Sequence, residues 1–360
     1  MIAAIDDGDA ELSLDELKLL LANLGIPVLG RVLQKRRSPD PATFIGSGKA
    51  IEIAAFASEI GANLLVLDDA LSPTQRSNLS KTTGLEVWDR AFTIMTIFER
   101  RANTSEAKWQ VELARLRYEI PSLKGLGHQM SRLGGGIGTR GPGETEFERH
   151  RRKLERRIKY IERNLENVRD RRARYRQRRS GSGVPVVSLV GYTNSGKSTL
   201  LRALSGDADV LAEDRLFSTL DTLTRKIEPP RGRPFLLSDT VGFIRKLPPE
   251  LIAAFRATLE EVVSADLLLL LLDASSPEPM KAFEIVLETL REIEADALPR
   301  IVALNKIDRA EEESRFLAAG LSSRGEDVVR ISALSGKGLP ELLAFLSEKL
   351  AWGDPMAYTE

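Results

Sequence analysis

The sequence has no cysteine and only two histidines, His128 and His150, among its 360 residues. The lack of cysteine excludes disulfide bonds and thiolate metal sites, and two histidines argue against a zinc enzyme or a histidine-based triad. The longest uninterrupted apolar run, residues 267–272, is far shorter than the roughly 20 residues that cross a bilayer. The acidic N-terminus lacks the order of a signal peptide, basic and then apolar. We therefore expect a cytoplasmic protein without a membrane span.

The net charge is zero, because 52 basic residues balance 52 acidic ones, but the charges are unevenly placed. Residues 147–179 carry fifteen Lys and Arg against five acidic residues, a local charge of +10 that leaves −10 for the rest of the chain. The length predicts two or three domains, each large enough for its own core.

The first part of the chain alternates short apolar runs with helical patterns. This alternation over residues 26–101 predicts parallel βαβ units, preceded by an amphipathic helix around residues 14–24. We therefore expect a small α/β domain over residues 1–103.

A helical hairpin is predicted over residues 104–180. Apolar residues recur at helical spacing in two segments, and we expect the first helix to end at Pro121 and the second to cover residues 147–179. A glycine-rich stretch joins them, and residues 180–185 are typical of a hinge. The two apolar stripes are Trp109, Leu113, Leu116 and Ile120, and Leu154, Ile158, Ile161, Leu165 and Val168.

From residue 184 to residue 350, continuous apolar runs are separated by helix-length intervals. Such runs are typical of strands covered on both faces, so we expect a doubly wound parallel sheet, followed by a tail over residues 351–360. Ligands of these sheets bind at the carboxyl ends of the strands.

Gly191 to Ser198 follows the first of these strands and fits G-x-x-x-x-G-K-[ST]. Its glycines let backbone N–H groups surround phosphate oxygens, Lys197 supplies a point charge, and the Ser198 hydroxyl can bind Mg²⁺. The alternative, a glycine turn that merely joins a strand to a helix, is disfavoured by the strand, loop and helix context.

Asn305 to Asp308 reads N-K-x-D at the end of a later strand. Guanine offers the N1–H and the exocyclic amino group, two donors that the Asp308 carboxylate can accept together. Adenine offers neither and would leave a buried carboxylate unpaired. A tetrapeptide of this kind also occurs in surface turns, but its place in the sheet favours guanine recognition.

Three more segments complete the predicted site. Asp239 ends a strand, where it can hold Mg²⁺ through water, and the Gly242 N–H can reach a γ-phosphate. A switch threonine in the segment 217–222 is expected to close on the metal, and residues 332–334 can support the base. The predicted nucleotide ligands are Gly191, Tyr192, Thr193, Asn194, Ser195, Gly196, Lys197, Ser198, Thr199, Phe217, Ser218, Thr219, Leu220, Asp221, Asp239, Thr240, Val241, Gly242, Asn305, Lys306, Ile307, Asp308, Ser332, Ala333 and Leu334; the predicted metal ligands are Ser198 and Thr219, and the predicted catalytic residues are Lys197, Thr219 and Gly242.

With these motifs, the chain resembles the HflX family of translational GTPases, of the Obg–HflX type. The resemblance also covers QKRRSPDPATFIGSGKA at 34–50 and SRLGGGIGTRGPGETEFE at 131–148, which are not general GTPase features. It implies a GTP hydrolase that uses GTP/GDP and Mg²⁺, binds the large ribosomal subunit, and splits or rescues stalled ribosomes. It also implies that the glycine-rich loop reaches ribosomal RNA through Arg132 and Arg140.

Two residues bear on the rate of hydrolysis. Many GTPases carry a water-orienting glutamine where this chain has Phe243, so we expect hydrolysis to be slow alone and stimulated by ribosomes. Asn194 occupies the position at which related GTPases use an asparagine to hold K⁺, although asparagine is also a common turn former.

The basic segment 147–179 favours RNA over its alternative, a solvated coiled-coil face. Gly46 to Lys49 is interpreted as a βα turn, with a second nucleotide site or an RNA contact as the alternative.

For the whole chain, which we expect to be a monomer, two other functions stay open. One is a GTP-dependent switch that acts on proteins only, and the other is an ATP-using RNA remodelling factor that acts through the N-terminal domain.

Overall fold

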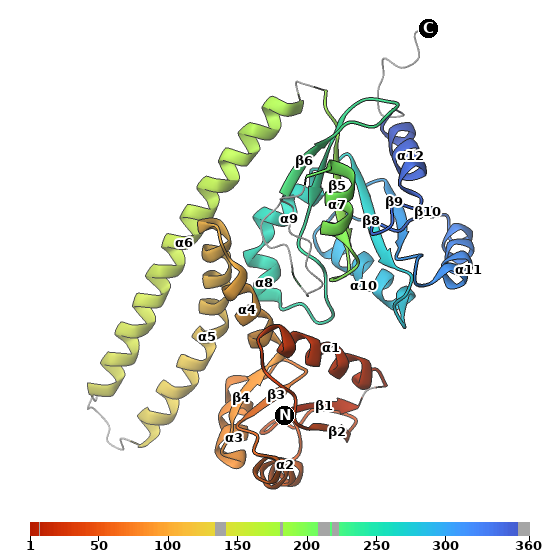
Figure 1. The fold of residues 1–360 in the computed structure, drawn as a ribbon. Helices are drawn as coiled ribbons and strands as arrows, with labels where there is room; N and C mark the ends of the chain where they lie inside the picture. Colours follow the sequence, from red (N-terminus) through yellow and green to blue (C-terminus); the bar gives the residue numbers. More distant parts are fainter. Residues whose placement is uncertain (7, 134–141, 181–182, 208–216, 218–222, 352–360) are drawn as a thin grey trace. The chain divides into compact units, whose positions relative to one another are not determined.

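The computed structural model describes residues 1–6, 8–133, 142–180, 183–207, 217 and 223–351, and its chain forms two compact units (Figure 1). Unit 1 contains Met1–Glu166 together with Lys246–Ala254, and unit 2 contains Asn167–Arg245 and Phe255–Glu360. The chain therefore leaves unit 2 after residue 245, adds nine residues to unit 1 and then returns.

Unit 1 is built on a four-stranded sheet whose strand order is β2-β1-β3-β4, with every pair parallel. Its core contains the buried faces of the sheet and of the second and third helices, with Ala3, Ile53 and Leu79 fully buried. The strands are β1 (Ile2–Asp6), β2 (Arg31–Lys35), β3 (Leu64–Leu67) and β4 (Glu86–Asp89), and the helices are α1 (Ala10–Asn23), α2 (Ser47–Ile60), α3 (Pro73–Thr83) and α4 (Arg90–Arg101).

The predicted parallel α/β domain is confirmed, but the prediction did not include β1. This strand is central, because Ile2 lies opposite both Arg31 of β2 and Val66 of β3. Its five residues include two alanines, so the apolar run is short and weak as a strand signal. The segment 46–49 is the start of α2, since Gly46 is the N-cap and Ser47 the first residue of this helix, and Lys49 pairs with Glu52 in its first turn.

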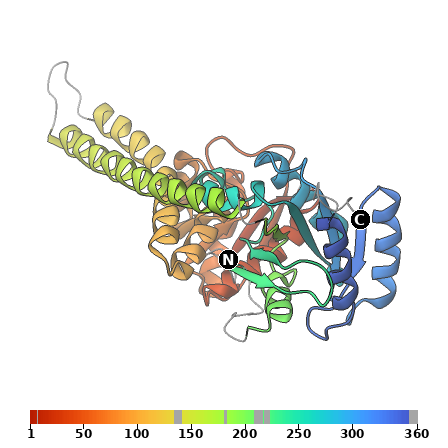
Figure 2. The same ribbon diagram turned by 90° about the horizontal axis from the view of Figure 1, so that it is seen from above.

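Two long antiparallel helices, α5 (Ser105–Leu133) and α6 (Pro142–Ser180), form the predicted hairpin and lie side by side in both views (Figures 1 and 2). Within unit 1, Arg157 forms a bidentate pair with Glu112 at 2.7 and 2.8 Å, and Arg117 Nη2 lies 2.8 Å from Glu162 Oε1. The residues between the helices, 134–141, are outside the described part of the chain.

The prediction that the first helix ends at Pro121 is wrong, because α5 continues through it to Leu133. Proline removes one N–H from the helical ladder and crowds the preceding turn, a local cost that a long helix held by its neighbours can absorb. One such neighbour is α8 (Pro249–Ala254), the returning segment of unit 1, in which Leu251 is 1% exposed.

Unit 2 contains a six-stranded sheet in the order β10-β9-β8-β5-β7-β6. Five strands are parallel, as predicted, whereas β6 pairs antiparallel with β7 at the edge. The strands are β5 (Val186–Gly191), β6 (Leu223–Ile227), β7 (Phe235–Asp239), β8 (Leu267–Asp273), β9 (Arg300–Asn305) and β10 (Asp327–Arg330), and the helices are α7 (Lys197–Ser205), α9 (Arg256–Val263), α10 (Pro279–Glu292), α11 (Glu311–Ser323) and α12 (Leu339–Ala351).

The chain order places a switch point between β5 and β8, because the chain passes from β5 to β7 on one side and later to β8 and β9 on the other. Ligands of open α/β sheets bind at such a point, outside the carboxyl ends of the strands. The loop after β5 begins there.

Among the helices of the described residues, we find none that combines the length and the apolar character needed to cross a membrane.

Candidate active site

The loop between β5 and α7 is shaped by two glycines with positive φ, Gly191 at 154° and Gly196 at 97°. A β-carbon on Gly191 would lie 2.4 Å from the carbonyl oxygen of Leu271, and one on Gly196 would lie 2.3 Å from Nδ2 of Asn305. Any side chain would therefore collide with its neighbours. The close packing brings the loop directly against β8 and β9, as a phosphate loop requires.

Lys197 is the first residue of α7 and is buried. Its Nζ donates to the carbonyl oxygens of Gly191 at 3.1 Å and Tyr192 at 2.9 Å. Burial lowers the pKa of Lys197 to about 8; the carboxylate of Asp239 opposes this shift, and the ammonium of Lys306 adds to it. Phosphate oxygens near this ammonium would favour its charged form.

The next residue, Ser198, meets the carboxylate at the end of β7. Its Oγ donates to Oδ2 of Asp239 at 2.8 Å, and Asp239 is fully buried. A hydroxyl and a carboxylate are oxygen ligands of the kind that Mg²⁺ prefers, so these residues fit that ion. Ser198 would bind it directly and Asp239 through water, while Thr219, the other predicted ligand, lies outside the described residues.

The segment after β7 lies against the phosphate loop. Thr240 is buried and donates to the carbonyl oxygen of Leu189 at 2.5 Å. Val241 is also buried, and a β-carbon on Gly242 would lie 3.0 Å from Nζ of Lys197. The structure thus brings Gly242 beside the lysine predicted to bind the phosphates.

The predicted base-binding residues come together at the ends of β9 and β10. Asn305 Nδ2 donates to the carbonyl oxygen of Ser195 at 2.8 Å, and its Oδ1 accepts the N–H of Ala333 at 2.9 Å. One side chain therefore links the phosphate loop to the loop after β10. Ser332 Oγ donates to Oδ1 of Asp308 at 2.5 Å, which orients this carboxylate.

The Asp308 side chain is exposed in this structure, so a bound base would have to bury it. Oδ1 is already engaged, and both oxygens lie on an open side chain that a purine could cover. Ile307 is buried, Leu334 is 72% exposed, and Lys306 Nζ pairs with Asp273 Oδ2 at 2.7 Å.

Not every predicted ligand can be placed. Of the loop between α7 and β6, Phe217 alone is described at its centre, where its N–H donates to Oγ1 of Thr193 at 3.3 Å. Ser218, Leu220 and Asp221 lie outside the described residues. Asn194 is exposed with φ 61°, and Thr199 lies in the first turn of α7.

Two residues of this region were not predicted. Asp273 ends the apolar run of β8, and an acidic residue at the carboxyl end of such a strand is a signal that the sequence does carry. Arg245 lies next to Tyr192 because its backbone N–H donates to the phenol oxygen at 3.0 Å. A contact to a backbone N–H does not depend on the identity of the residue, so the sequence does not predict it.

A phosphate loop at the switch point, a paired hydroxyl and carboxylate, and the linked Asn305 and Asp308 loops together define a P-loop GTPase. Family models match most of the chain: residues 11–99 match the GTP-binding GTPase N-terminal region, residues 101–179 match the GTP-binding GTPase middle region, and residues 186–306 match the family described as 50S ribosome-binding GTPase. The chain belongs to the HflX family of GTPases.

Curated relatives support this assignment. The chain is 45% identical over 350 residues to the GTPase HflX of Caldanaerobacter subterraneus subsp. tengcongensis, covering 97% of this chain and 80% of that protein. It is 42% identical to the GTPase HflX of Escherichia coli over 96% of this chain and 80% of that one. The chain is therefore an enzyme that binds guanine nucleotides and hydrolyses GTP.

A solved structure shares the arrangement. It is the crystal structure of a GTP-binding protein from the hyperthermophilic archaeon Sulfolobus solfataricus in complex with GDP, 27% identical with a TM-score of 0.50, covering 98% of this chain and 99% of that one.

Proposed function

We propose that the chain binds the large ribosomal subunit in the cytoplasm, as a monomer, and couples GTP binding and hydrolysis to ribosome splitting or rescue. The observation that carries this proposal is the match of residues 186–306 to a family described as 50S ribosome-binding GTPase. The charge pattern supports RNA as the surface that is bound, because residues 147–179 concentrate a charge of +10 in a chain of zero net charge.

The RNA-binding surface is provided by α6. Several of its basic side chains are exposed along the helix, among them Arg156, Arg163, Arg171 and Arg174. RNA is a polyanion, so binding that neutralises several phosphates is strong and depends steeply on salt. Arg132 and Arg140 of the glycine-rich segment are proposed as further RNA contacts; residue 140 and the side chain of residue 132 lie outside the described part of the chain.

Hydrolysis is slow without the ribosome because nothing at position 243 can orient water. Phe243 is only 1% exposed and apolar, so its ring neither donates to nor accepts from the attacking water. Lys197 and Gly242 would contact the γ-phosphate, Ser198 and Thr219 would hold Mg²⁺, and Asn194 would help to hold K⁺.

Phosphate release from GTP, measured with and without purified large subunits, tests this proposal. We expect large subunits to stimulate GTP hydrolysis at least about tenfold, and to stimulate ATP hydrolysis not at all. A tenfold stimulation corresponds to an activation free energy lowered by about 1.4 kcal/mol. ATP serves as the nucleotide control, and small subunits serve as the RNA control. Rates in K⁺ and in Na⁺ are compared in the same assay.

Normal GTP binding with no stimulation by large subunits would contradict the proposal and favour a switch that acts on proteins only. Equal stimulation by small subunits would show a response to RNA in general. Equal rates in K⁺ and Na⁺ would remove the role given to Asn194.

A further inference from the structure

A short backbone pairing joins the segment after β7 to the phosphate loop. The N–H of Phe243 donates to the carbonyl oxygen of Gly191 at 3.1 Å, and the N–H of Thr193 donates to the carbonyl oxygen of Phe243 at 2.7 Å. These two bonds form an isolated parallel bridge between Tyr192 and Phe243. We call residues 242–245, which lie against the phosphate loop in this way, the docked segment.

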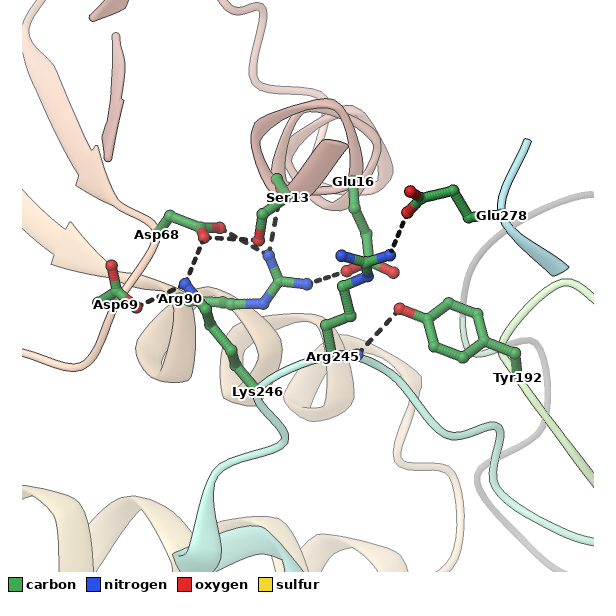
Figure 3. A network of polar contacts seen from close by, with 9 residues as sticks. All are labelled: Ser13, Glu16, Asp68, Asp69, Arg90, Tyr192, Arg245, Lys246 and Glu278. Carbon is green, nitrogen blue, oxygen red and sulfur yellow. Dashed lines mark hydrogen bonds and ion pairs between the residues drawn. The ribbon is translucent and has the colours of Figure 1, made fainter. Parts of the chain in front are cut away.

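The side chain of Tyr192 extends this pairing by two residues. Its phenol oxygen accepts the backbone N–H of Arg245 at 3.0 Å, and Figure 3 shows the ring reaching toward that amide. The Arg245 guanidinium in turn lies 2.9 Å from Oε2 of Glu278, at the N-cap of α10. The docked segment is thus held at both ends, by the phosphate loop and by α10.

The docked segment lies close to the residues proposed to hold the γ-phosphate. A β-carbon on Gly242 would already lie 3.0 Å from Nζ of Lys197 and 2.9 Å from Cα of Thr193, closer than van der Waals contact. A phosphoryl group is much larger than a methyl group. Because Lys197 and Gly242 are the groups proposed to contact the γ-phosphate, we infer that the segment moves away from Lys197 when this phosphate enters between them.

We propose that Tyr192 sets the selectivity of the site between its substrate GTP and its product GDP. The phenol oxygen stabilises the docked segment, which is compatible with the β-phosphate but not with the γ-phosphate. Every contact that only GTP must break lowers the affinity for GTP and leaves that for GDP unchanged. Tyr192 is therefore a specificity-determining residue that acts through the backbone of Arg245.

This inference rests on the nucleotide site proposed above, and the experiment separates the two. The affinities of Mg²⁺-GDP and of a non-hydrolysable GTP analogue are measured for the full chain, for Tyr192→Phe and for Tyr160→Phe. Phenylalanine keeps the ring and removes the hydroxyl, whose oxygen accepts the Arg245 N–H. Tyr160 is 53% exposed on α6 and serves as the matched control.

We expect Tyr192→Phe to raise the affinity for the GTP analogue relative to GDP by about two- to tenfold, the effect of one hydrogen bond, and Tyr160→Phe to leave this ratio unchanged. Glu278→Gln, which weakens the other anchor, should shift the ratio in the same direction. In the unaltered chain, hydrogen exchange of the Arg245 amide should accelerate when the GTP analogue binds and not when GDP binds.

An unchanged affinity ratio in Tyr192→Phe would overturn the role of Tyr192, as would slower exchange of the Arg245 amide with the GTP analogue. If the unaltered chain bound neither nucleotide, the site assignment itself would fail, and this inference with it.

Discussion

At the scale of single residues, the proposed recognition of the base depends on the geometry around Asp308. The Ser332 hydroxyl holds one carboxylate oxygen, and Asn305 links the same loop to the phosphate loop. Two acceptors fixed side by side match the two donors on one edge of guanine. We therefore propose that the Asp308 side chain, oriented by Ser332, selects the nucleotide.

Asp308→Asn should change the preferred nucleotide from GTP to XTP. Asparagine replaces one acceptor with a donor, and xanthine carries a carbonyl where guanine has the amino group. We expect the GTP affinity to fall about 10²- to 10⁴-fold, because two charge-assisted hydrogen bonds are lost, while XTP binds well. Competition binding of GTP and XTP measures both effects.

The exposed residue Asp296 provides the matched control, since Asp296→Asn changes the charge by the same amount outside the base-binding loops. A variant of Asp308 that still preferred GTP would show that this carboxylate does not read the base.

At the scale of elements, α6 combines a packed stripe with a basic surface. Ile161 is fully buried on one side of the helix, whereas Arg163 and Arg171 are exposed. Two ion pairs, Arg117 with Glu162 and Arg157 with Glu112, join α5 to α6. The exposed arginines are thus presented on a rigid element.

Substituting Arg163, Arg171 and Arg174 by glutamine should weaken binding to large subunits and make it less sensitive to salt. Glutamine preserves helix propensity, so α6 should stay folded. If each arginine contacts a phosphate, the slope of log K against log salt concentration should become shallower by about 2. Co-sedimentation at several KCl concentrations measures this slope.

The control removes the same charge elsewhere, with Lys18, Lys81 and Arg231, all exposed, replaced by glutamine. If both triple variants lost affinity equally, net charge rather than α6 would govern binding.

The elements show how far the sequence alone can predict this fold. Periodicity predicts α6 and the parallel strands β5, β8 and β9, because each is a long run with one period. It does not predict β6, because three of the five residues of this strand are polar and the strand is stabilised by pairing with β7. The fixed spacing of the phosphate-loop and N-K-x-D motifs makes their residues predictable, whereas the contact of Tyr192 with a backbone amide depends on tertiary structure.

At the scale of the whole molecule, the two units have separate hydrophobic cores. The core of unit 2 includes Leu189, Leu269 and Ala303, and that of unit 1 includes Leu65 and Leu67. Nucleotide contacts are proposed in unit 2 only. Each core should therefore give its own response to a stabilising ligand or a destabilising substitution.

Unit 1 also contains a buried ionic network around Asp68, which is fully buried (Figure 3). Ser13 Oγ donates to this carboxylate at 2.6 Å. The Asp68 carboxylate also forms ion pairs with Arg90 at 2.7 Å and with Lys246 at 2.8 Å. Arg90 is 1% exposed and also pairs with Glu16. Removing Arg90 would leave Glu16 and Asp68 with less compensation of their charge, although Lys246 still pairs with Asp68.

Arg90→Met should lower the free energy of unfolding of unit 1 by about 3–5 kcal/mol. We expect two transitions in calorimetry, of which Arg90→Met lowers one and GDP raises the other. Arg231→Met, at an exposed position of unit 2, is the control. A single transition that moves with both changes would show that the two cores unfold together.

The return of residues 246–254 to unit 1 also has a consequence for the order of events during protein synthesis. Lys246 reaches an aspartate that lies 178 residues earlier in the chain. Domains usually fold as their sequence leaves the ribosome, the N-terminal one first. Here unit 1 must wait for its last helix until β5, β6 and β7 of unit 2 have emerged, so the nascent chain carries an incomplete unit 1 until residue 254 has been synthesised.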